Sequence, residues 1–81
     1  MFVLLMPHAK KDLAKLQPNE REKAIRKLDA LEKEPYSGKK LTGEFKDLYS
    51  LRSWPYRILY QIDKPNKLVK VTKVSHRQSA Y

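Results

Sequence analysis

Cysteine is absent from this chain of 81 residues, and glycine occurs only at Gly38 and Gly43. Without cysteine there is no disulfide, no thiolate nucleophile and no thiolate metal ligand, which favours a reducing, cytoplasmic location. A phosphate-binding loop needs closely spaced glycines that lead into a helix, and these two glycines are too far apart for one. The sequence therefore argues against thiol chemistry and against an enzyme driven by a nucleotide.

Metal ligands are also scarce. His8 and His76 lie near opposite ends of the chain, and neither is accompanied by carboxylates at the spacing that a metal site requires. A two-metal nuclease needs several convergent carboxylates, whereas the predicted strands carry arginine, lysine and tyrosine. We therefore expect neither a metal nor another cofactor.

Long hydrophobic runs are missing as well. The apolar run over residues 1–6 is followed at once by Pro7 and His8. It is too short to be a membrane span or the apolar part of a signal peptide. We expect a buried strand here, either covered on both faces or shielded by a helix on one face, and no membrane association.

Positive charge is in excess. The chain has 18 Lys+Arg against 9 Asp+Glu, a formal net charge of +9 at pH 7. No acidic residue follows Asp63, so the C-terminal end is strongly basic. The cations after that position are Lys64, Lys67, Lys70, Lys73 and Arg77. So dense a positive field attracts polyanions and steers association with nucleic acid.

The hydrophobic periodicity predicts a single α+β domain over residues 1–81. A strand over 1–6 is followed by a helix over about 8–16 and by a second helix that begins at Pro18 or Asn19 and ends before Pro35. Residues 36–43 are interpreted as a loop, and extended segments follow over about 45–53, 55–63 and 67–75. The order β-α-α-β-β-β predicts a helical hairpin packed on one face of a small, mainly antiparallel four-stranded sheet.

The second helix and the last strand have distinctive patterns. In the helix we expect an apolar stripe of Ala24, Ile25, Leu28 and Leu31, with Arg21 on the solvent side. In the last strand, apolar residues occur on both parities, which indicates a central strand or a bulged one. These residues are Leu68, Val69, Val71 and Val74.

The middle strand alternates regularly. Its apolar set is Tyr56, Ile58, Tyr60 and Ile62. Because successive side chains point to opposite faces, Arg57 and Gln61 leave the face that we assign to the helices.

Several side chains are suited to RNA cleavage without a metal. In that reaction the 2′-hydroxyl attacks the neighbouring phosphate, so the protein must orient it, stabilise the added charge and move protons. Arg57 and Arg77 suit the charge because a guanidinium binds two phosphate oxygens. His76 and Tyr81 can move protons. These four are the candidate catalytic residues, and they meet if the last strand runs beside the middle one.

A second set of residues is suited to binding RNA. Cationic side chains can contact its backbone, and Trp54 can stack on a base. The candidate RNA-binding residues are Lys46, Arg52, Trp54, Lys70 and Lys73.

Several candidates also have a purely structural interpretation. Arg57 can form an ion pair with Asp47 or Asp63, and His76 can cap the end of a strand. The terminal Tyr81 can fray, and Trp54 can pack within its turn.

Three stretches together resemble the RelE/ParE superfamily of toxins, and more closely its RelE branch of ribosome-dependent mRNA endoribonucleases. They are LTG at 41–43 leading into LYSLR at 48–52, YRILYQI at 56–62, and VSHRQSAY at 74–81. Each is moderately specific, and their order and spacing span nearly the whole chain.

The resemblance implies a RelE-like fold and a toxin that enters the ribosomal A site and cleaves mRNA, leaving a 2′,3′-cyclic phosphate and a 5′-hydroxyl. It also implies a cognate antitoxin as partner. By resemblance, Arg57 contacts the phosphate in the transition state and Arg77 is the arginine of the tail motif. Tyr81 stacks on a base and orients the nucleophile, and Arg52 contacts the RNA backbone.

One departure from the RelE pattern concerns proton transfer. Members of the branch often have basic residues where this chain has Leu48 and Ser50. Either Lys46 or His76 takes over their role, or the protein is a weak catalyst.

Two other functions remain open. A ParE-like poison of DNA gyrase would share the fold without cutting RNA, although Trp54 and the 76–81 tail favour RelE. The other open function is a non-catalytic basic module that binds RNA or only an antitoxin. The evidence for it is that Leu48 and Ser50 stand where basic residues are expected.

Overall fold

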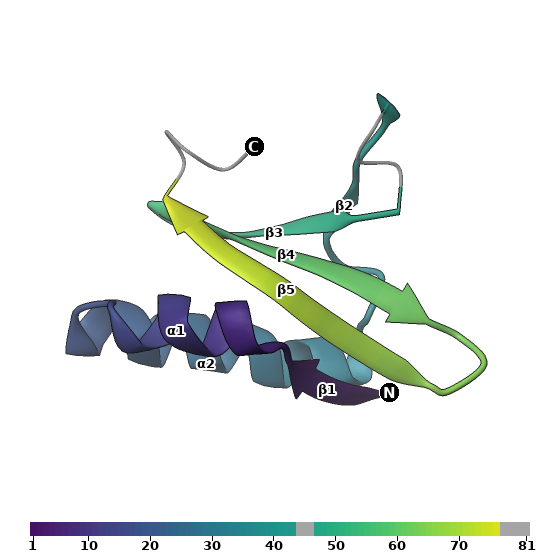
Figure 1. Ribbon diagram of the computed structural model, residues 1–81, viewed down its shortest axis with the longest axis horizontal. Coiled ribbons are helices and arrows are strands. Elements are labelled where there is room, and N and C mark those ends of the chain that lie inside the picture. Colours follow the sequence, from purple (N-terminus) through teal and green to yellow (C-terminus); the bar gives the residue numbers. More distant parts are fainter. Residues whose placement is uncertain (44–46, 77–81) are drawn as a thin grey trace.

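The computed structural model describes residues 1–43 and 47–76. Strand β1 (Phe2–Leu5) leads into helices α1 (Pro7–Ala14) and α2 (Pro18–Lys33). The strands that follow are β2 (Lys39–Lys40), β3 (Tyr49–Ser53), β4 (Tyr56–Asp63) and β5 (Leu68–His76). Within the described residues the strands form one sheet in the order β1-β5-β4-β3-β2, with both helices on the same face (Figure 1). β1 is parallel to β5 and the other pairs are antiparallel, which confirms the α+β class and the helical hairpin.

The sheet has five strands in the described residues, not the expected four. The additional strand, β2, lies in the segment that we interpreted as a loop, and its residues pair with Ser50 and Tyr49 of β3. Two residues give no periodicity, so hydrophobic patterning has nothing to detect at this position.

Strand β1 lies at the edge of the sheet. Of the two expected arrangements, the structure has the one in which a single face of the strand is covered. Phe2 is 67% exposed and Leu4 is 40% exposed. Val3 and Leu5 point the other way and pack against the core. A continuous apolar run does not distinguish a strand covered on both faces from an edge strand of this kind.

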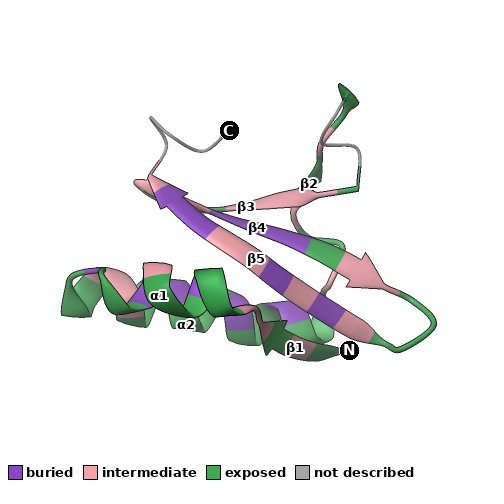
Figure 2. Ribbon diagram, in the orientation of Figure 1, coloured by how far each residue is buried: buried purple, intermediate pink, exposed green. Residues whose placement is uncertain are grey.

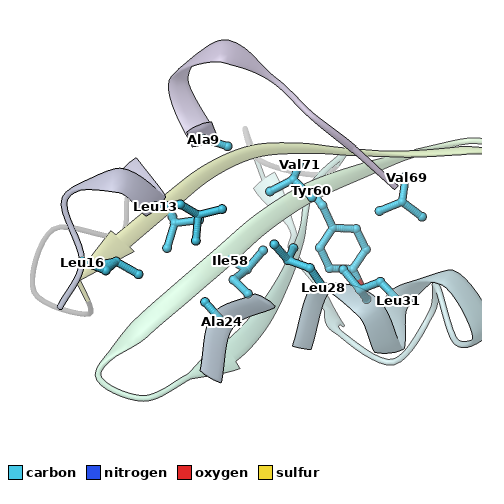
Figure 3. Packing of buried hydrophobic residues seen from close by; sticks show 11 residues of the cluster. Ala9, Leu13, Leu16, Ala24, Leu28, Leu31, Ile58, Tyr60, Val69 and Val71 are labelled. Atoms are coloured by element: carbon cyan, nitrogen blue, oxygen red, sulfur yellow. The ribbon is translucent and has the colours of Figure 1, made fainter. Parts of the chain in front are cut away.

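The core lies between the helices and one face of the sheet. Both helices begin at a proline, Pro7 and Pro18, where the missing N–H leaves no helical hydrogen bond unmade. The buried residues of the helices pack against β4 and β5 (Figure 3), and buried positions recur along both strands (Figure 2). The labelled core residues are Ala9, Leu13, Leu16, Ala24, Leu28, Leu31, Ile58, Tyr60, Val69 and Val71. Ile25, expected in the apolar stripe, is 43% exposed instead.

A bulge in β5 explains its apolar residues on both parities. Leu59 pairs with Lys73 but Tyr60 pairs with Val71, so Thr72 is the additional residue. The Thr72 hydroxyl donates a hydrogen bond of 3.1 Å to the Leu59 carbonyl oxygen. The bulge shifts the alternation by one residue, so Val74 joins Val71 in the core. The strand is therefore both central and bulged.

Arg21 does not lie on the solvent side of α2 as expected. Its guanidinium donates hydrogen bonds to three carbonyl oxygens at the end of α1, at 3.1, 3.1 and 2.9 Å. The acceptors belong to Leu13, Ala14 and Leu16. These carbonyls belong to the last turn of α1 and to the residues just after it, so Arg21 caps α1 and fixes the turn between the helices.

No helix among the described residues is long and apolar enough to cross a membrane.

We predict that Arg21→Ala lowers the free energy of unfolding by about 2 kcal/mol, because hydrogen bonds from a charged donor to the end of α1 are lost. Arg26→Ala, at an exposed position of the same helix, changes it by less than about 0.5 kcal/mol. Urea unfolding of both variants measures the difference. Equal stabilities would contradict the capping role.

Candidate nucleic-acid interface

The face of the sheet that points away from the helices collects basic side chains, and we call it the open face. Arg52 of β3 lies directly opposite Arg57 of β4. On the other side of β4, Lys73 of β5 lies opposite Leu59, two residues along from Arg57 on the same face. The sheet therefore brings together three predicted site residues, Arg52, Arg57 and Lys73.

The two arginines line a hollow of about 180 Å³, which we call the β2–β4 hollow. Its described lining residues are Lys39, Leu41, Ser50, Arg52 and Arg57. Three of these described lining residues are cations and none is a carboxylate. Like charges directly opposite each other on neighbouring strands repel, and an anion placed between them relieves that repulsion. A phosphate group has the charge and the geometry for such a site.

Ser75 is the residue of β5 that lies opposite Arg57. It is buried, at 6% exposure, and its Oγ has no hydrogen-bond partner among residues 1–43 and 47–76. A buried hydroxyl without a partner is uncommon in native proteins. This one lies next to the arginine that the sequence singled out.

Trp54 lies at the tip of the β3–β4 hairpin and is 51% exposed. The Lys23 ammonium of α2 donates a 3.2 Å hydrogen bond to its carbonyl oxygen, which places the tip beside the helices. The ring is accessible enough to stack on a base.

Lys70 lies farther along the open face. Its partner in the ladder is Gln61, and its ammonium forms an ion pair with Asp63 at 3.4 Å. Hydrogen bonding from the Asn66 side chain, assisted by Lys70, lowers the pKa of Asp63. Asp63 is six positions from Arg57 on β4, roughly 20 Å at the rise of a strand, so it does not pair with that arginine.

His76 is not brought to the open face. It lies opposite Tyr56 in the ladder and packs edge-on against that ring, with the centroids 5.5 Å apart. Tyr56 belongs to the core side of β4, so the side chains of His76 and Arg57 leave the sheet on opposite faces. Three other predicted site residues, Lys46, Arg77 and Tyr81, lie outside the described residues.

Lys39 and Ser75 are site residues that sequence reasoning missed. Lys39 lies in the segment interpreted as a loop, where side chains have no assigned face. Once β2 is known to pair with β3, parity alone places Lys39 beside Ser50. Among the described residues, no group of three or more histidine or acidic side chains is arranged to hold a metal ion.

A family model described as the ParE toxin of the type II toxin–antitoxin system parDE matches residues 3–81. The chain is a type II toxin of the RelE/ParE superfamily. No curated protein matches it significantly.

Solved structures similar to the toxin agree with this assignment. The RelBE2 toxin–antitoxin complex of Mycobacterium tuberculosis has a chain that is 33% identical to this one, with a TM-score of 0.87. The match covers 94% of the present chain and 96% of the chain from that complex. A chain of the RelE–RelB complex of Pyrococcus horikoshii OT3 is 28% identical, with a TM-score of 0.82, and the match covers 98% of the present chain and 97% of that one. The isolated E. coli RelE toxin is 32% identical, with a TM-score of 0.77, and the match covers 93% of the present chain and 82% of the RelE chain.

We predict that Arg52→Glu weakens binding of a short single-stranded RNA by at least about tenfold at low salt, because it reverses the charge beside Arg57. Arg26→Glu changes the net charge equally but lies on an exposed position of α2, so its effect is smaller. Fluorescence anisotropy at matched ionic strength measures both affinities. Equal losses would mean that only net charge matters.

Proposed function

We propose that this toxin is a metal-independent endoribonuclease that enters the ribosomal A site and cleaves mRNA, inhibiting translation. The observation that supports this best is the cross-strand pair of Arg52 and Arg57 in a hollow whose described lining carries no carboxylate. The resemblance to the RelE branch supports the choice of mRNA as substrate, and the net charge of +9 suits a partner made largely of RNA.

In the proposed reaction the ribose 2′-oxygen attacks the adjacent phosphorus and the bond from phosphorus to the 5′-oxygen breaks. The products are a 2′,3′-cyclic phosphate and a 5′-hydroxyl. One proton leaves the 2′-hydroxyl and one is added to the departing 5′-oxygen. Arg57 stabilises the negative charge that develops on the non-bridging oxygens, and Arg52 holds the neighbouring backbone.

The groups that move the protons are proposed from sequence. Arg77 and Tyr81 are proposed from the resemblance. His76 packs against Tyr56, and this position directs its ring away from the face that carries Arg57. The fold therefore does not support His76 as a direct participant beside Arg57.

We also propose that the toxin binds a cognate antitoxin. The similar toxins of Mycobacterium tuberculosis and Pyrococcus horikoshii were each solved in a toxin–antitoxin complex. An antitoxin that covers the open face with acidic side chains would neutralise the same cations that we assign to RNA.

Poisoning of DNA gyrase is the second candidate function. The family model that matches the chain is that of the ParE toxins, which is the observation in its favour. The cation-lined hollow also suits a DNA phosphate, so the fold by itself does not separate the two activities.

We predict that Arg57→Ala lowers the rate of mRNA cleavage on programmed ribosomes by at least about 100-fold, as is typical when one donor to a developing oxyanion is removed. The same variant should no longer arrest growth when expressed. Arg26→Ala removes an equal charge from an exposed helical position and should cleave like the wild type.

The origin of the toxicity separates the candidate functions. Mapping the 5′ ends of cellular mRNA after brief induction should show cuts within translated codons. Intact mRNA together with a DNA-damage response would instead establish the gyrase poison. If mRNA on programmed ribosomes stays intact and cells show no DNA damage, both activities are excluded and the non-catalytic binding module is the remaining function.

A further inference from the structure

Lys39 occupies a position that the sequence pattern left unfilled. The RelE-like pattern suggests a basic residue at position 50, where this chain has Ser50. Lys39 of β2 lies directly opposite Ser50, and both line the β2–β4 hollow. Directly opposed residues of an antiparallel pair have Cβ atoms about 5 Å apart, so the lysine side chain begins beside the small serine. The ammonium group is thereby placed within reach of the space that a longer residue 50 would occupy.

The charge of Lys39 adds to that of the two arginines. The side chain is exposed, and the close contacts between basic and acidic side chains given for the described residues are His8 with Asp12 and Lys70 with Asp63. Lys39 therefore adds a positive charge to the hollow, and no described carboxylate forms an ion pair with it. Three cations from three adjacent strands around one hollow concentrate positive potential where a phosphate would bind.

The buried residue Tyr60 determines where β2 begins. Its hydroxyl donates a hydrogen bond to the Pro35 carbonyl oxygen and accepts one from the Gly38 N–H, both at 2.9 Å. The side chain is fully buried and stacks on Tyr49 with the ring centroids 5.4 Å apart. Burial raises the pKa of Tyr60, so the hydroxyl keeps its proton at neutral pH. The residue immediately before Lys39 is thus fixed to the core of the protein.

Gly38 is part of the same arrangement. A Cβ at position 38 would lie 2.5 Å from the Tyr60 hydroxyl oxygen and 3.0 Å from the Ser50 carbonyl oxygen. A larger residue would therefore push the chain away from Tyr60 and displace the start of β2. The close approach requires glycine at this position, and it places Lys39 against β3.

We propose that Lys39 is a third phosphate-binding cation of the β2–β4 hollow, acting at the place of the basic residue missing at position 50, and that the Tyr60 hydroxyl positions it through Gly38. This inference rests on the proposed function for the identity of the substrate as RNA. It adds Lys39 as a residue that contacts the substrate and Tyr60 as a positioning residue.

Lys40 provides a matched control. It is the next residue of the same short strand, carries the same charge and is equally classed as exposed. It lies opposite Tyr49, so its side chain leaves the sheet on the other face. Replacing either lysine by alanine removes one charge from β2, but only Lys39→Ala removes it from the hollow.

The test measures how salt affects binding of a short 2′-O-methyl RNA, which cannot be cleaved through its 2′-oxygens. For single strands, each phosphate contact contributes about 0.7 to the slope of log K against log salt concentration. We expect Lys39→Ala to lower that slope by about 0.7 and Lys40→Ala to leave it unchanged. A wild-type slope for Lys39→Ala, or equal losses for both variants, would overturn the role of Lys39.

The role of Tyr60 is tested in the same assay. Tyr60→Phe removes both hydrogen bonds and keeps the ring, so we expect the slope to fall as in Lys39→Ala, with no further fall in the double variant. A merely structural role would lower stability and leave the slope unchanged, which would overturn the positioning role. Should Tyr60→Phe fail to fold, Gly38→Ala is measured instead with the same expectation.

Cleavage on programmed ribosomes separates this inference from the proposed function. If the wild type cleaves and Arg57→Ala does not, the proposed function stands. In that case, if the Lys39→Ala variant cleaves and binds RNA as the Lys40→Ala variant does, the inference about Lys39 is overturned while the proposed function stands. If the wild type leaves mRNA intact, the proposed function fails, and the salt slopes of the two lysine variants still decide whether Lys39 contacts phosphate.

Discussion

The position of every candidate site residue on the sheet depends on the register of β4. This strand is paired on both sides, with β3 and with β5, and its side chains alternate between the core and the open face. Ile58 and Tyr60 are fully buried against the helices. Arg57 precedes Ile58 in the strand, so its side chain must point to the opposite face of the sheet. A slip of one residue would bury the arginine and expose the aromatic rings. Burial of the core therefore fixes where the charge is placed.

That alternation is also why much of the fold was predictable from sequence. Regular alternation over eight residues of β4 assigned Arg57 to a face correctly, and the prolines at 7 and 18 marked where the helices begin. The prediction was wrong or left alternatives open where local patterns carry little information. β2 is two residues long, and an apolar run such as β1 looks alike whether one face or both are covered. Arg21 caps α1 through a tertiary contact that no helical periodicity reveals.

The candidate site was predictable to a similar extent. Arg52 and Arg57 were each expected in regular strands that are neighbours in sequence, and the antiparallel pairing of those strands brings the two arginines together. His76 was expected beside Arg57, but the ladder pairs it with Tyr56 and so assigns it to the other face. Lys39 reaches the hollow through an irregular segment fixed by a core tyrosine, which is a non-local effect. Membership of the RelE/ParE superfamily fixes the fold and leaves the chemistry to these particular side chains.

The most direct test of the interface is to map RNA binding on the protein by NMR. Titration of the labelled toxin with a short 2′-O-methyl RNA should shift the amide signals of β2, β3 and β4 around Lys39, Arg52 and Arg57. The exposed residues of α1 and α2 should shift little, since the helices cover the opposite face of the sheet (Figure 1). Shifts centred on the helices, with the strands unaffected, would contradict the assignment of the open face as the RNA-binding surface.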